Sequence, residues 1–239
     1  MWTRNEYAFD DRVSIRHRRG REGRGPSPWR KWSWFCGESD HLRHLDQTER
    51  PRTGSIGYNE RVPTYLAFLR AVNLGAKRVF PKDDIRRVVE GVGFIAVETY
   101  INTGNVRFRT SMRSRARIES ALEAAFAADR GFDVPTIVFS QEEFRRVAED
   151  VAELSAAHPA LARHYVYLLK EPPAHEERAA IEATSSGEGR MVVRGRAAHA
   201  LLSPGYQEGE VDPLAAAKLL GVATNRTHTV VTALAARWC

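Results

Sequence analysis

The chain has 239 residues, of which 43% are hydrophobic and 28% are charged. This composition supports one large or two small domains with a buried core, so it excludes a chain that is disordered throughout. No apolar run approaches the ~18 residues that a membrane-spanning helix needs. The two cysteines, Cys36 and Cys239, are too few for a disulfide framework. We therefore expect a cytoplasmic protein with no membrane partner.

The positive charge is concentrated in the first quarter of the sequence. The whole chain carries a formal net charge of +6, of which +4 belongs to residues 1–62. The run at residues 16–26 is too polar and too rich in glycine to form a core, and such blocks are typical of disordered tails or polyanion-binding arms. We predict that residues 1–62 form a basic, disordered extension outside the fold, or that translation of the natural protein begins near Val62.

A group of possible metal ligands lies within this segment. Cys36, His41, His44 and Asp46 are close in sequence. Their spacing matches no standard zinc pattern, and no second cysteine pair accompanies them. We therefore expect no metal site and no cofactor.

The pattern of apolar and polar residues changes at Pro63, where regular elements are expected to begin. A short apolar run at residues 64–72 is typical of a buried strand, and Pro81 suits the first turn of a helix. The Asn-Thr-Gly-Asn sequence at residues 102–105 is typical of a tight hairpin. The expected order is β-α-β-β-α-β, with strands at 64–72, 95–101, 106–108 and 134–139 and with helices that begin at Pro81 and Arg115.

A similar order of elements follows. Ser140 and Glu143 form a capping box for a helix that reaches about Val151. Beyond it we expect strands at 165–169, 191–193 and 198–202, helices at 174–183 and 212–220, and a terminal helix in place of a clear fourth strand. The sequence therefore predicts an α+β fold of two ferredoxin-like halves, 63–152 and 153–239, related by duplication.

Three motifs in this order resemble a known family. They are Leu-Arg-Ala-Val-Asn-Leu-Gly at 69–75, Thr-Tyr-Ile-Asn-Thr-Gly-Asn-Val at 99–106, and Ala-Thr-Asn-Arg at 223–226 followed by a run of threonine and valine. Over about residues 63–237 the chain resembles an uncharacterised bacterial family, domain of unknown function 1697. The resemblance implies two ferredoxin-like halves and no established activity. Ala71 and Ala76 stand where the family usually has glycine.

The expected topology brings two polar loops together. The first two strands of such a half are parallel, so the loop at 70–80 and the hairpin at 102–105 should meet at one edge of the sheet. Cations and amides beside a helix N-terminus suit phosphate or carboxylate. Alternatively, the asparagines only satisfy loop backbone. The candidate ligand-binding residues are Arg70, Asn73, Lys77, Asn102, Thr103 and Asn105, with Arg226 completing the set.

These residues favour a non-catalytic binder of an anionic ligand, either a nucleotide, a phosphorylated metabolite or a nucleic-acid backbone. No phosphate loop, nucleophile elbow or metalloprotease motif is present, so the sequence indicates no enzyme class. An enzyme acting on a small anionic substrate with the same loops and His228 is the alternative. His199, between two alanines, is expected to be a packed histidine. The oligomeric state stays open.

A second alternative is RNA binding on the open face of the first sheet. Alternation places Arg107 and Arg109 on one side of their strand, where Tyr100 and Phe68 could join them. Aromatic and basic side chains on central strands suit the stacking of single-stranded bases. The glycine- and aromatic-rich strand of known RNA-binding modules is missing, which favours packing or solvated arginines on this face.

Overall fold

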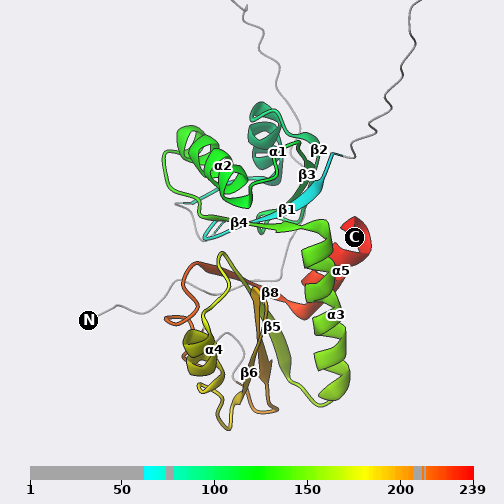
Figure 1. The fold of residues 1–239 in the computed structure, drawn as a ribbon, viewed down its shortest axis with the longest axis vertical. Coiled ribbons are helices and arrows are strands. Elements are labelled where there is room, and N and C mark those ends of the chain that lie inside the picture. Colours follow the sequence, from blue (N-terminus) through cyan, green and yellow to red (C-terminus); the bar gives the residue numbers. More distant parts are fainter. Residues whose placement is uncertain (1–61, 74–77, 207–211, 213) are drawn as a thin grey trace, which may run out of the picture. The chain divides into compact units, whose positions relative to one another are not determined.

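A computed structural model describes residues 62–73, 78–206, 212 and 214–239. Within these residues the chain forms two four-stranded antiparallel sheets and five helices (Figure 1). The α+β class expected from the sequence is therefore confirmed. The basic extension and the cysteine–histidine group of residues 1–61, together with Lys77, lie outside the described residues. Every described helix is too short or too polar to cross a bilayer.

The first half contains one sheet and two helices. Its sheet has the order β2-β3-β1-β4, and α1 and α2 cover one face of it (Figure 1). α1 turns its apolar residues Ile85, Val88 and Val89 towards the sheet, and α2 begins at the N-cap Ser114, whose hydroxyl accepts from Arg117 N. The elements are β1 (Thr64–Leu69), α1 (Lys82–Gly91), β2 (Ile95–Tyr100), β3 (Asn105–Arg109), α2 (Arg115–Arg130) and β4 (Thr136–Ser140).

The helix that follows leads from the first half into the second. The hydroxyl of Ser140 accepts from Glu143 N at 3.1 Å, which is one half of the expected capping box, whereas the Glu143 carboxylate accepts from Arg196. α3 (Gln141–Ala157) then continues past the expected end near Val151. The second sheet has the order β6-β7-β5-β8. Its elements are β5 (Arg163–Leu169), α4 (His175–Glu182), β6 (Gly189–Arg194), β7 (Ala197–Leu202), β8 (Ala223–Thr227) and α5 (His228–Trp238).

Two expectations for the end of the chain are wrong. The described residues between 212 and 220 form turns rather than a helix. The Asp212 carboxylate does accept from the backbone N–H groups of Ala216 and Ala217, but Ala215 has a φ of 54°, which no right-handed helix allows. The fourth strand, expected to be missing, is present as β8 and pairs with β5.

The two halves share one apolar core. Leu66 and Phe68 of β1 belong to the same buried cluster as Val166 and Leu168 of β5, with α3 and α5 contributing further side chains. α3 and α5 lie side by side (Figure 1). The face of the first sheet opposite α1 and α2 is therefore covered by protein rather than by solvent.

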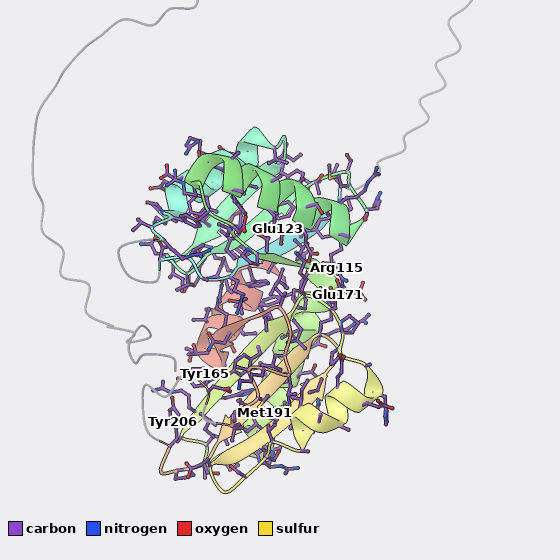
Figure 2. The ribbon with its side chains drawn as sticks, turned by 90° about the vertical axis from the view of Figure 1, so that its left-hand side faces the viewer. Arg115, Glu123, Tyr165, Glu171, Met191 and Tyr206 are labelled. Atoms are coloured by element: carbon purple, nitrogen blue, oxygen red, sulfur yellow. The ribbon has the colours of Figure 1, made fainter. Side chains whose placement is uncertain are left out.

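Buried polar contacts fasten the halves as well. Arg196 of the second half is 6% exposed, donates to both carboxylate oxygens of Glu143 at 2.7 and 2.9 Å, and donates to Val138 O at 2.6 Å. An exposed ion pair also links the halves, since Arg115 of α2 pairs with Glu171 at 2.6 Å (Figure 2). The charge-assisted pair with Glu143 compensates the charge of the buried Arg196 guanidinium.

Candidate functional site

The loop after β1 and the β2–β3 hairpin meet, as the topology requires. Leu69 N donates to Gly104 O at 2.8 Å, and Asn73 Nδ2 donates to Asn102 O at 2.6 Å. Gly104 has a φ of 73°, and a Cβ there would lie 2.7 Å from the Cβ of Leu69. Only glycine allows this close approach of the hairpin to β1.

Asn73 organises the loop after β1. Its Oδ1 accepts from Phe80 N at 2.7 Å, and its Nδ2 donates to Phe80 O at 2.9 Å as well as to Asn102 O. The residue has a φ of 57°, a conformation that asparagine tolerates better than most residues. Its carboxamide therefore joins the two loops to each other, as in the alternative in which the asparagines satisfy loop backbone.

Arg226 of β8 reaches from the second half into the hairpin of the first. Its Nε donates to Asn105 Oδ1 at 2.7 Å, and its Nη2 donates to Thr103 O at 2.7 Å. Its Nη1 donates to Thr224 Oγ1 at 2.9 Å and to Asn225 O at 2.6 Å. The side chain is thus held on both sides, and Arg226 is only 8% exposed.

The charge of Arg226 has no acidic partner among the described residues. All four of its acceptors are neutral oxygens, and one hydrogen on Nη2 is left without a described acceptor. Burial lowers its pKa to about 10, so the guanidinium stays protonated at neutral pH. An arginine that is buried without a counter-ion leaves positive charge at this junction.

Asn105 is held so that its oxygen faces this cation. The residue is 1% exposed, and its Nδ2 donates to Tyr100 O at 3.1 Å and to Thr103 Oγ1 at 2.8 Å. These two bonds fix which end of the carboxamide points at Arg226. The predicted residues Thr103 and Asn105 thus support the arginine, while the side chain of Asn102 is exposed.

Two further arginines lie on the loop after β1. Arg70 is exposed, follows the residue that bonds to Gly104, and has no side-chain partner among the described residues. Arg78 donates from Nε to Ala71 O at 2.8 Å and from Nη2 to Asp133 O, and its guanidinium lies 4.7 Å from the centre of the Phe132 ring. Like Arg226, Arg78 contacts carbonyl oxygens rather than carboxylates. The sequence places Arg78 on the loop at 70–80 that was expected to meet the hairpin, but nothing in that position signals these carbonyl contacts.

The alternative of RNA binding on the open face of the first sheet is wrong at Phe68. This ring is fully buried against Phe144 at a centroid distance of 5.0 Å, and Tyr100 meets Trp238 edge-on at 6.4 Å. Arg107 pairs with Glu98 at 2.7 Å, and Arg109 donates to Val62 O at 3.3 Å. The four residues share a face, but α5 and the second half cover it, so Phe68 offers no surface on which a base could stack.

Histidines form a separate cluster in the second half. His164 Nε2 lies 3.1 Å from His199 Nδ1, and His164 Nδ1 lies 3.0 Å from Ser155 Oγ. His228, the residue of the enzyme alternative, stacks on His164 with centroids 5.8 Å apart. The packed environment expected for His199 is confirmed, since this residue is fully buried. Its position in the sequence gave no sign of its partner His164 on β5, or of the contact that His164 makes with Ser155 of α3.

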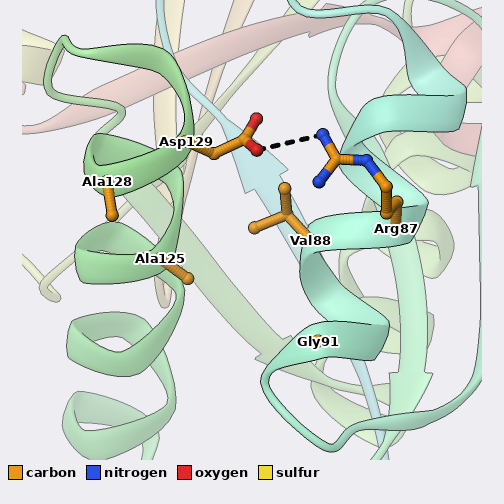
Figure 3. A pocket seen from close by; sticks show the side chains of 6 residues that line it. All are labelled: Arg87, Val88, Gly91, Ala125, Ala128 and Asp129. Carbon is orange, nitrogen blue, oxygen red and sulfur yellow. Dashed lines mark hydrogen bonds and ion pairs between the residues drawn. The ribbon is translucent and has the colours of Figure 1, made fainter. Parts of the chain in front are cut away.

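One open groove lies away from these loops, between α1 and α2. It has a volume of about 370 Å³ and is lined by Val88, Gly91 and Ala125, with the Arg87–Asp129 ion pair of 2.9 Å at one end (Figure 3). Both charges of the pair are already matched. In the described part of the chain, no three histidine, cysteine or acidic side chains are arranged to hold a metal ion.

Comparisons with known proteins agree with this architecture. A solved structure of the conserved bacterial protein SP0830 from Streptococcus pneumoniae is similar, with a TM-score of 0.58 and 21% sequence identity over 74% of this chain and 99% of that chain. At this identity the likeness shows the fold alone. The family model described as protein of unknown function (DUF1697) matches residues 62–199, and the chain belongs to that family. The comparison with curated proteins found no match.

Proposed function

We propose that this protein is a non-catalytic binder of an anionic ligand, namely a nucleotide, a phosphorylated metabolite or a nucleic-acid backbone. The site is the junction of the loop after β1 with the β2–β3 hairpin. The observation that carries the proposal is Arg226, a buried guanidinium that contacts four neutral oxygens and no described carboxylate. In this reading each half is a ferredoxin-like unit, and the protein acts in the cytoplasm.

A comparison within the same molecule supports a role for this charge beyond fastening the halves. Arg196 is buried to a similar degree and also links the two halves, but it has Glu143 as its partner. A carboxylate is the stronger partner for a buried guanidinium. Arg226 has no carboxylate partner within the part of the chain that the structure describes, and its Nε donates to the neutral Oδ1 of Asn105. An uncompensated cation of this kind favours a negatively charged ligand beside it.

The residues have different roles in the proposed site. Arg70 and Asn102 are exposed and are expected to contact the ligand directly, with Lys77 as a further predicted contact. Arg226 supplies positive potential from its buried position against the hairpin, and Asn105 and Asn73 hold the loops in place. Arginine can bind phosphate or carboxylate with two parallel N–H groups, which gives the contact a defined geometry.

The test is a binding titration with inorganic phosphate and with ATP, followed by calorimetry. The wild-type chain is expected to bind, and Arg70→Gln is expected to weaken binding at least tenfold, since a charge-assisted hydrogen bond contributes about 1.5–3 kcal/mol. Arg190→Gln is the matched control, because Arg190 is an exposed arginine on β6 of the second half. Equal affinity of wild type and Arg70→Gln would reject the site.

A further inference from the structure

Two exposed aliphatic side chains accompany the cations of the proposed site. Val79 is 50% exposed and Ile101 is 41% exposed. The residues that follow them, Phe80 and Asn102, both have their carbonyl oxygens bonded to the same nitrogen, Nδ2 of Asn73. One carboxamide thus holds the two aliphatic residues on neighbouring stretches of the loop and the hairpin.

Ile101 is unfavourable where it stands on two independent grounds. Its φ is 48°, a left-handed conformation that is a genuine outlier for a β-branched residue. Its side chain is also exposed, so it gains little of the burial that would offset this strain. Strained residues of this kind gather at ligand-binding loops, where the surrounding structure holds them in place.

We infer that the ligand is an amphipathic anion, whose charged group lies beside Arg70 over Arg226 and whose apolar part covers Val79 and Ile101. This inference rests on the proposed function and narrows its ligand class. A phosphate monoester or carboxylate with an aliphatic or ring portion fits, whereas an anion without an apolar part leaves the two aliphatic side chains in water. Arg78 stays with its carbonyl acceptors and shapes the loop.

The test uses inorganic phosphate and three esters that differ only in apolar length, namely ethyl phosphate, butyl phosphate and hexyl phosphate, all titrated by calorimetry. Each methylene that leaves water strengthens binding up to about fourfold when fully buried. On an open surface we expect about a twofold gain per methylene, so hexyl phosphate should bind the wild-type chain at least tenfold more tightly than inorganic phosphate does.

The double variant Val79→Thr/Ile101→Asn removes both aliphatic side chains. Asparagine also tolerates the positive φ at position 101, so the hairpin is expected to fold. This variant should bind all four probes with the affinity of inorganic phosphate. Ile95→Thr is the matched control, since Ile95 is 53% exposed at the other end of β2, and it should keep the wild-type dependence on length.

The outcomes separate this inference from the proposed function. If inorganic phosphate binds and Arg70→Gln abolishes its binding, but alkyl length has no effect, the anion site stands and the apolar contact is rejected. If length matters equally in the wild type and the double variant, the apolar part lies elsewhere and the assignment to Val79 and Ile101 is rejected. If none of the probes binds the wild-type chain, both proposals fail.

Discussion

Acid is expected to destabilise this protein through its buried imidazole pair. His164 and His199 are 2% and 0% exposed, and burial lowers their pKa values to about 3 and about 4. Nearby positive charge lowers these pKa values further, since His199, His228 and His158 act on His164, and Arg194 acts on His199. Among the described residues, no carboxylate acts to raise the pKa of either ring.

The direction and the magnitude of this pH effect on the free energy of unfolding follow from proton linkage. In the unfolded chain both imidazoles return to a pKa of about 6.5, so below that pH the unfolded chain binds two protons that the folded chain does not. The stabilising contribution is complete above pH 6.5 and is lost as the pH falls towards the folded values of about 4 and about 3. At pH 5.5 the loss is about 1.4 kcal/mol for each imidazole, or about 3 kcal/mol for the pair.

The assay is urea unfolding followed by circular dichroism at pH 7.5 and pH 5.5. His164→Leu/His199→Leu removes both titrating rings, so its free energy of unfolding should fall between the two pH values by about 3 kcal/mol less than that of the wild type. The single variant His199→Leu should remove about half of the difference. His175→Gln, at an exposed histidine of α4, is the control and should behave like the wild type. The same acid response in wild type and double variant would refute the reasoning.

Two further predictions concern stability and are measured by the same unfolding assay at pH 7.5. Gly104→Ala should destabilise the protein by about 2–4 kcal/mol, because its Cβ would meet the side chains of Leu69 and Val72 and its φ of 73° would be strained. A loss below 0.5 kcal/mol would show that the hairpin can move away from β1. Glu119→Ala should cost about 1–3 kcal/mol by leaving the N–H of Val138 unpaired, whereas Glu119→Gln, which keeps an acceptor, should cost clearly less. Equal losses for both variants would contradict this explanation.

The elements with apolar patterns could be predicted from the sequence, and β8 could not. In β8 the buried side chains are Thr224 and Arg226, so the buried positions of the strand carry polar residues, as the exposed position does. The period-2 signal of a strand depends on hydrophobic side chains at the buried positions. Here tertiary hydrogen bonds replace them, and they become visible only when both halves are in place.

The false helix at 212–220 arose from a correct local signal. Asp212 does act as a cap, since its carboxylate accepts from backbone N–H groups at residues 216 and 217. A cap satisfies the N–H groups of one turn but does not make the following turns form. Ala215 adopts a left-handed conformation inside that first turn, and nothing in its sequence context indicates this.

For the candidate site, the sequence predicts which loops meet, but it predicts only in part which of their polar groups are available to a ligand. The meeting of the two loops follows from the order of strands, and Leu69 N to Gly104 O is the bond that expresses it. Which polar atoms remain available does not follow from the order. Asn73 and Asn105 use their carboxamides on neighbouring groups of the protein, which leaves Arg70 and Asn102 as the exposed candidates for direct contact.

Backbone strain is concentrated in the two loops of the proposed site. Of the described residues other than glycine that have positive φ, Ala71, Asn73 and Ile101 lie in these loops. A left-handed conformation costs about 1–2 kcal/mol at a residue with a Cβ, and glycine at position 71 would avoid it. The contacts that hold the loops in this state are the bonds of Asn73 and Arg226, and no carboxylate of the described residues pairs with the charge of the arginine. In the proposed site, a bound anion would offset that charge and would contact the strained loops.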